Sequence, residues 1–177
     1  MTAPLAGDGF ALRRATEADV DFLVELASHE EVEPFMAAVS ARGRDELLAE
    51  VRRSEDDPQH HGRFVVEVAG AAAGSLAFSV VNRRSRIAHL YSIMLHPDHR
   101  GRGLAVAATE LFVRHLVFEL DYHRVQLEVY GFNERALVLF ERAGFVREGV
   151  RRRAYDRHGD WADGVLFGLV REDLEGG

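Results

Sequence analysis

The residue types best suited to binding a phosphate lie in the stretch His96–Ala105, whose sequence is HPDHRGRGLA. This stretch follows a predicted strand, which Pro97 stops, and it leads directly into a predicted helix. Glycines let a backbone approach a ligand closely, and the free N–H groups and dipole of a helix N-terminus favour a phosphate or pyrophosphate. A purely structural tight turn would also explain the glycines.

Two familiar nucleotide-binding motifs are excluded here. Val106 stands where the dinucleotide fingerprint needs a third Gly or Ala. All 22 basic residues are Arg, so the lysine-containing loop of kinases and ATPases is absent, and Schiff-base and pyridoxal chemistry is excluded as well. Because there is no cysteine, the chain also has no disulfide, thiolate nucleophile, iron–sulfur cluster or cysteine zinc site.

A second informative pattern lies further along the chain. Asn133 opens a short predicted helix, and Gly144-Phe145 ends it. Asn is a good N-cap and Gly a good C′ residue, so helix capping alone would explain both. Each pattern taken singly leaves the chemistry undecided.

The candidate proton acceptor is His89, because imidazole titrates near neutral pH. Strand alternation places it on one face of the predicted strand 86–96, together with Tyr91, Ile93 and Leu95. A histidine packed in the sheet with a satisfied hydrogen bond is the alternative interpretation. Glu128, on another predicted strand, is a weaker candidate.

The elements that must position these residues follow a clear order. Strands are expected at 10–14, 63–69, 74–81, 86–96, 123–130, 145–153 and 164–171, and helices at 20–28, 44–53, 103–120 and 133–143. Thr16 and Asp19 resemble a capping box at the start of the first helix. The order predicts an α+β fold with a mixed sheet flanked by helices, in a single domain over residues 1–177.

Charge is distributed unevenly along the chain. The net charge is −7, with 14 acids and 6 Arg in residues 1–62 (−8) and 15 acids and 16 Arg in the remainder (+1). This acidic excess argues against a nucleic-acid partner. Glu30, Glu31 and Glu33 form an acidic cluster that suits a cationic partner, although a solvated surface would look the same.

Neither a metal site nor a membrane span is predicted. His29 and Glu33 have the i,i+4 spacing of metal ligands, but no third ligand is apparent. No apolar run reaches the roughly 18 residues that a membrane span needs. The N-terminus has no basic segment followed by an apolar stretch, so we expect a cytoplasmic protein.

In this order and spacing, the two patterns resemble the signatures of the GNAT superfamily of acyl-CoA-dependent N-acyltransferases. The family's loop reads Q/R-x-x-G-x-G/A, and its second signature reads N-x-x-A, then an aromatic residue, then G-F. The matching residues are Arg100, Gly103 and Ala105, and then Asn133, Ala136, Phe140, Gly144 and Phe145. The resemblance covers residues 10–171 and is nearest the branch of ribosomal-protein-alanine and spermidine acetyltransferases.

The resemblance implies a GNAT-like, mostly antiparallel sheet of about seven strands flanked by about four helices. In it, strands 86–96 and 123–130 run parallel and splay apart at their C-terminal ends. It further implies acetyl-CoA as co-substrate and no metal. The residues it assigns to acetyl-CoA are Ile93, Met94 and Leu95 for the pantetheine arm, Arg100, Gly101, Arg102, Gly103, Leu104 and Ala105 for the pyrophosphate, and Asn133 and Phe140 nearer the acetyl end.

The implied reaction is acetyl transfer to the primary amine of a small cationic molecule or a protein N-terminus. A free alkyl amine has a pKa of about 10, so a base such as His89 must remove a proton. Many family members carry a Tyr acid where this chain has Phe140, so Tyr130 or water must protonate the leaving thiolate. Acceptor contacts are expected from Tyr91 and the acidic cluster of Glu30, Glu31 and Glu33.

The same departure at Phe140 keeps a second function open. The chain is then a catalytically weak or inactive acyl-CoA-binding module that acts as a sensor or as a partner of another protein. A homodimer through the terminal strands is common in such folds.

Overall fold

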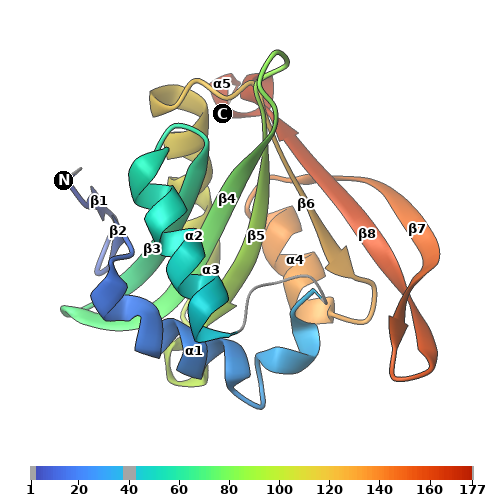
Figure 1. The fold of residues 1–177 in the computed structure, drawn as a ribbon. Coiled ribbons are helices and arrows are strands. Elements are labelled where there is room, and N and C mark those ends of the chain that lie inside the picture. Colours follow the sequence, from blue (N-terminus) through green and yellow to red (C-terminus); the bar gives the residue numbers. More distant parts are fainter. Residues whose placement is uncertain (1–2, 38–42, 177) are drawn as a thin grey trace.

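An open sheet of eight strands forms the centre of the fold, in the order β1-β2-β3-β4-β5-β6-β8-β7 (Figure 1). The computed structural model describes residues 3–37 and 43–176. The strands are β1 (Leu5–Ala6), β2 (Ala11–Arg14), β3 (His61–Val68), β4 (Ala71–Asn82), β5 (Ile87–Leu95), β6 (Arg124–Tyr130), β7 (Val146–Arg157) and β8 (Asp160–Val170). β5 and β6 run parallel, and the other neighbouring strands are antiparallel.

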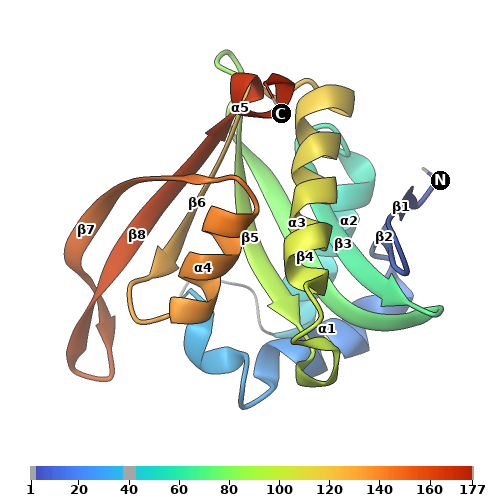
Figure 2. The same ribbon diagram turned by 180° about the vertical axis from the view of Figure 1, so that it is seen from behind.

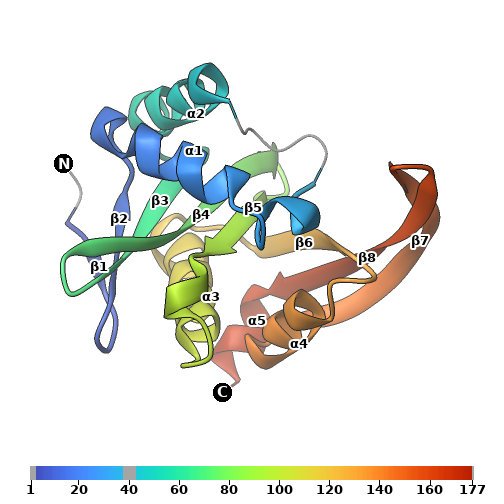
Figure 3. The same ribbon diagram turned by 90° about the horizontal axis from the view of Figure 1, so that it is seen from below.

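Helices cover both faces of this sheet (Figures 2 and 3). One face carries α1 (Val20–Ser28) and α2 (Arg44–Asp56), and the other carries α3 (Leu104–Arg114) and α4 (Glu134–Arg142), while α5 (Arg171–Glu175) follows β8. This confirms the predicted mixed α/β GNAT-like fold.

Strand alternation distributes the core between these two layers. In β3, Phe64 and Val66 belong to the main apolar core with Phe112 of α3. Val65, between them in the sequence, packs instead with Leu23 of α1 and with α2. Side chains of successive strand residues point to opposite faces, so one strand contributes to both layers and fixes the sheet between them.

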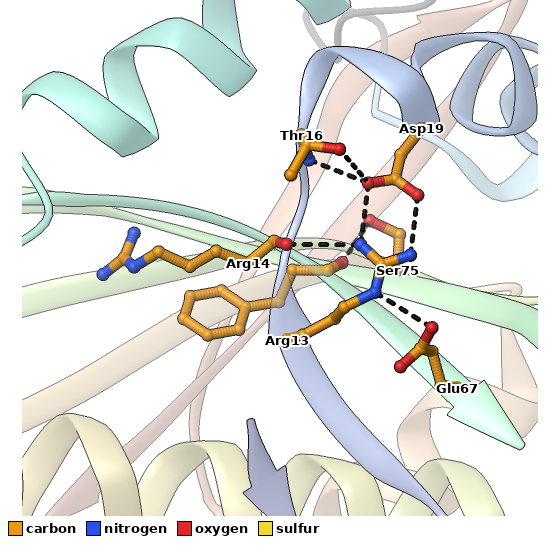
Figure 4. Close-up of polar contacts among 7 residues, drawn as sticks. Arg13, Arg14, Thr16, Asp19, Glu67 and Ser75 are labelled. Carbon is orange, nitrogen blue, oxygen red and sulfur yellow. Dashed lines mark hydrogen bonds and ion pairs between the residues drawn. The ribbon is translucent and has the colours of Figure 1, made fainter. Parts of the chain in front are cut away.

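The start of α1 is held by Arg13, which connects β2, β3 and the helix (Figure 4). Its guanidinium donates to both carboxylate oxygens of Asp19 at 2.7 and 2.8 Å, and its Nε lies 2.9 Å from Glu67 Oε1. The backbone N–H and the hydroxyl of Thr16 also donate to Asp19, at 2.8 and 3.0 Å. The predicted capping box is therefore present, and it opens a 3₁₀ turn, Glu17–Asp19, that runs into α1.

These contacts also set the charge of Asp19. Its burial would raise the pKa of the carboxyl, but the hydrogen bonds from Arg13 and Thr16 outweigh it and lower the pKa below its usual value of 3.8. Asp19 is thus an ionised, hydrogen-bonded carboxylate at neutral pH.

The parallel pair β5–β6 is short, as expected. The two strands pair only at Ile87–Arg124, Ala88–Val125 and His89–Gln126. Beyond this point β5 contains an irregularity opposite Ser75 and Ala77 of β4, and Ser92 has a left-handed backbone with φ of 48°. Such a bulge bends a strand and increases its twist. The predicted splaying of the two strands is confirmed, and it opens the sheet at its centre.

Several boundaries differ from the predictions. β1 and α5 were not expected, because two strand residues and five helical residues carry no periodic signal. The predicted helix 103–120 is α-helical only to Arg114 and continues as a π-helical turn, His115–Glu119. The terminal hairpin is longer than predicted because His158 and Gly159, with φ of 57° and 92°, form a tight two-residue turn.

Candidate active site

A cavity of about 1160 Å³ lies where β5 and β6 separate. It exceeds the usual range for small-molecule pockets, roughly 300–1,000 Å³. Its walls come from five parts of the chain: the segment after α1, β5 and the loop that follows it, the first turn of α3, β6 with α4, and Tyr155 of β7. The predicted phosphate loop and the predicted proton acceptor therefore open into one space.

The glycine loop forms one end of this cavity. Gly101 and Gly103 have φ of 82° and 74°, and a Cβ atom at either position would meet no atom within 4 Å. Both therefore require the conformational freedom of glycine while their outer side remains open. Gly103 is the N-cap of α3, and the first N–H groups of a helix have no partner within the helix. Of the predicted loop residues, all but Arg102 line the cavity.

Arg100 connects this loop to the segment after α1. Its Nη1 lies 3.0 Å from Glu31 Oε2, its Nη2 donates to the Glu31 carbonyl at 3.2 Å, and its Nε donates to the Leu95 carbonyl at 3.3 Å. Of the predicted acidic cluster only Glu31 lines the cavity, whereas Glu30 and Glu33 are not among its lining residues. The charge of Glu31 is thus engaged by Arg100.

The second sequence motif also lies at the cavity. Asn133 caps α4, since its Oδ1 accepts from the Ala136 N–H at 3.2 Å, and it lines the cavity as well. Phe140 is 2% exposed and packs on Phe145 and Phe167, with ring centroids 5.6 and 5.9 Å away. It reaches the cavity wall from within the core. Its phenyl ring has no acidic proton to donate.

The half of the cavity farther from the glycine loop, which we predicted to receive the acceptor and call the acceptor half, is lined by His89, Tyr91, Glu128, Tyr130 and Tyr155. His89 and Tyr91 line it from β5, with their rings stacked 6.4 Å apart. Burial lowers the pKa of His89 below 6.5, an effect that the nearby charge of Glu128 opposes. The imidazole is therefore neutral at neutral pH, as a proton acceptor must be. Glu128 in turn accepts a hydrogen bond from the Tyr155 hydroxyl at 2.7 Å.

Tyr130 is a buried side chain in this half of the cavity. It is 5% exposed, yet its hydroxyl has no hydrogen-bond partner among the described residues. Its ring stacks on Phe132 at 5.1 Å and meets Tyr155 edge-on at 5.6 Å. An unpaired buried hydroxyl costs about 1–3 kcal/mol. Because Tyr130 lines the cavity, a bound ligand is the natural partner for this group.

Apart from Arg102, Glu30 and Glu33, the predicted ligand and acceptor residues thus come together at one cavity from distant parts of the sequence. The backbone segment Ile93, Met94 and Leu95 lines the cavity between the glycine loop and His89. The lining residues that were not predicted include Phe35, Met36 and Tyr155. No local motif marks them, since Phe35 and Met36 reach the site through the packing of the segment after α1, and Tyr155 through that of β7.

Two further observations concern the described part of the chain, residues 3–37 and 43–176. There, no three histidine or carboxylate side chains are grouped closely enough to hold a metal ion. None of its helices has the length and apolar character needed to cross a membrane.

Comparison with known proteins identifies relatives of this chain. Residues 10–146 match the profile of the acetyltransferase (GNAT) domain. The chain is 34% identical over 85 residues to the SPbeta prophage-derived uncharacterized N-acetyltransferase YokL of Bacillus subtilis, which covers 48% of each protein. It is 29% identical over 107 residues to the spermidine N(1)-acetyltransferase of Escherichia coli, covering 60% of this chain and 57% of that protein. The matches thus span about half the length of these curated relatives.

Solved structures with the same fold cover nearly the whole chain. A spermidine N-acetyltransferase from Vibrio cholerae in complex with CoA and spermine superposes with a TM-score of 0.82 at 24% identity, over 94% of this chain and 98% of that one. A ribosomal-protein-S5-alanine acetyltransferase from Vibrio fischeri gives a TM-score of 0.83 at 15% identity, over 97% and 98%. At these identities the similarity establishes the fold.

Proposed function

Since the chain belongs to the GNAT acetyltransferase domain family, we propose that it transfers the acetyl group of acetyl-CoA to the primary amine of a small cationic molecule or a protein N-terminus. The observation that carries this proposal is the single cavity that joins the open glycine loop to a neutral buried imidazole and an unpartnered tyrosine hydroxyl. One end suits a pyrophosphate, and the other holds groups able to move protons.

The glycine loop and α3 account for binding of acetyl-CoA. Positive-φ glycines leave room at the backbone, and the N–H groups of Leu104 and Ala105 lie at the positive end of the helix dipole. Arg100 adds a positive charge beside them. The separated edge of β5 at Ile93, Met94 and Leu95 offers backbone groups for the pantetheine amides, and Asn133 offers a side-chain amide from the opposite wall.

The acceptor half accounts for proton movement. His89, neutral because it is buried, takes a proton from the acceptor ammonium and so exposes the nitrogen lone pair. The nitrogen then forms a bond to the acetyl carbon, and the carbon–sulfur bond breaks. The reaction converts an ammonium and a thioester into an amide, a thiol and one proton, which leaves through His89.

Two groups assist this exchange. A backbone N–H near Ile93 or Met94 stabilises the carbonyl oxygen as it gains negative charge, and a fixed donor of this kind contributes roughly 3 kcal/mol. Tyr130 supplies the proton that the departing sulfur needs, in place of Phe140, and the unpaired state of its hydroxyl leaves it available. The second proton that the nitrogen loses on becoming an amide restores the Tyr130 hydroxyl. A thiol pKa of about 8.5 makes sulfur a tolerable leaving group even before it is protonated.

A second candidate function rests on Phe140. Its phenyl ring stands where many relatives carry a proton donor, and it is packed into the core. If Tyr130 does not replace that donor, the chain is an acyl-CoA-binding module that acts as a sensor or protein partner. Both candidates require the same glycine loop, so binding of CoA does not separate them.

Catalysis is the feature that distinguishes the two candidates. Purified protein is mixed with acetyl-CoA and a panel of primary amines, and free thiol is followed with a thiol reagent. An acetyltransferase releases thiol only when acetyl-CoA and an amine are both present. A protein that binds acetyl-CoA in calorimetry but releases no amine-dependent thiol is a binding module.

A further inference from the structure

The acceptor end of the cavity is built largely from aromatic rings. Phe35, of the 3₁₀ turn Glu33–Phe35, lines the cavity and is 42% exposed. Its ring lies 6.1 Å from that of Phe132, which does not line the cavity itself but is 48% exposed and stacks on the lining residue Tyr130. Tyr155 completes the group from β7. Large exposed rings are unfavourable in water, so this row of aromatic faces indicates a surface for an apolar group.

Arg157 fixes the row in place. Its guanidinium lies 5.1 Å above the Tyr130 ring, and its Nη2 donates to the Pro34 carbonyl at 2.7 Å. The residue therefore links β7 to the turn that carries Phe35 and to the ring that carries the unpartnered hydroxyl. The aromatic row is accordingly assembled from three segments and is preorganised for binding.

Charge at this end does not favour a second cation. Among the described residues, three acids line the cavity, and two of them lie elsewhere in it: Glu31 is paired with Arg100, and Glu134 is the first residue of α4. The third, Glu128, accepts a hydrogen bond from Tyr155 and lies 3.6 Å from Arg151 Nε.

We propose that the acceptor is an arylalkylamine, a primary amine on a short alkyl chain that ends in an aromatic ring. The ring packs against Phe35 and Tyr130, which line the cavity, while the single ammonium group lies toward Glu128 and His89. Contacts between aromatic rings contribute more to the binding free energy than the buried apolar area alone provides. A polyamine would instead bring its remote cation close to Arg151 and Arg157. This inference rests on the acetyltransferase function proposed above.

The test compares three amines in the thiol-release assay: 2-phenylethylamine, n-butylamine and spermidine. We expect kcat/KM to be highest for 2-phenylethylamine, at least tenfold above n-butylamine. In Phe35→Ala the ratio of kcat/KM for 2-phenylethylamine to kcat/KM for n-butylamine should fall roughly tenfold, because the packing surface for the ring is lost. Val81→Ala is the matched control, since Val81 is a 55% exposed apolar residue that does not line the cavity, and its ratio should equal that of the wild type.

The outcomes separate this inference from the proposed function. Transfer to spermidine or n-butylamine that equals or exceeds transfer to 2-phenylethylamine overturns the aromatic acceptor and leaves the acetyltransferase intact. An unchanged ratio in Phe35→Ala overturns it as well. Absence of transfer to any amine, with acetyl-CoA still bound, instead refutes the acetyltransferase. Phe35→Leu, which keeps an apolar side chain at this position, should restore part of the ratio if Phe35→Ala folds poorly.

Discussion

Replacing Gly103 with Glu tests where the pyrophosphate binds. Gly103 has φ of 74°, caps α3 and lines the cavity, and a Cβ atom there would meet nothing within 4 Å. The substitution therefore introduces no clash. It adds backbone strain of about 1–2 kcal/mol and a carboxylate at the mouth of the proposed phosphate site.

The two effects can be separated by magnitude and by control. Unit charges about 4 Å apart repel by about 1 kcal/mol in water and about 4 kcal/mol near a protein surface. An intermediate repulsion of about 2 kcal/mol corresponds to roughly 30-fold weaker binding, since about 1.4 kcal/mol is tenfold. Gly103→Ala carries the strain without the charge. Gly70→Glu carries both, with φ of 80° and open space, in a turn that does not line the cavity.

Calorimetric titration with acetyl-CoA and thermal unfolding provide the measurements. All three variants should lose a similar few degrees in Tm, because about 1 kcal/mol shifts a domain of this size by roughly 2–4 °C. Only Gly103→Glu should lose about 30-fold in affinity, with little loss in Gly103→Ala and none in Gly70→Glu. Unchanged affinity in a folded Gly103→Glu variant would refute the assignment of this loop.

Three further predictions address the catalytic half and the fold. The ratio of kcat/KM for wild type to kcat/KM for His89→Gln should rise with pH and then become constant, with an apparent pKa below 6.5. Titration of the amine substrate affects both proteins equally and cancels in this ratio. A ratio independent of pH excludes His89 as the base. Tyr130→Phe should lower kcat at least tenfold without lowering Tm, because it removes a buried hydroxyl that has no partner; an unchanged kcat excludes Tyr130 as the acid. Asp19 has a folded-state pKa below 3.8, so its stabilisation is present above that pH and is lost as pH falls through the folded value. Asp19→Asn should thus lower the free energy of unfolding by about 1–3 kcal/mol at pH 7, as measured with denaturant. This difference from wild type should become smaller below pH 4, and a difference that does not change with pH would contradict the assignment.

The parts of the site that the sequence predicts are those encoded locally. The glycine loop is recognisable because Gly101 and Gly103 must both adopt positive φ directly before a helix. Asn133 and Gly144 are visible because helix ends favour these residue types. Strand alternation likewise predicts that His89 and Tyr91 share a face, and the structure stacks their rings.

The parts that escaped prediction depend on contacts between distant segments. Arg100 and Glu31 are 69 residues apart in the chain, and Arg157 reaches the Pro34 carbonyl across 123 residues. Neither hydrophobic periodicity nor a sequence motif predicts such pairs. The π-helical turn at His115–Glu119 is also hidden, because the apolar pattern of the helix continues through it.

The most direct test of the central claim is detection of the acetylated amine itself. Wild-type protein is incubated with acetyl-CoA and 2-phenylethylamine, with a wider amine panel in parallel, and the products are analysed by mass spectrometry. We expect amines that carry one added acetyl group, formed in amounts equal to the CoA released and strongly reduced in His89→Gln. Tight binding of acetyl-CoA without any acetylated amine would contradict the account and favour an acyl-CoA-binding module.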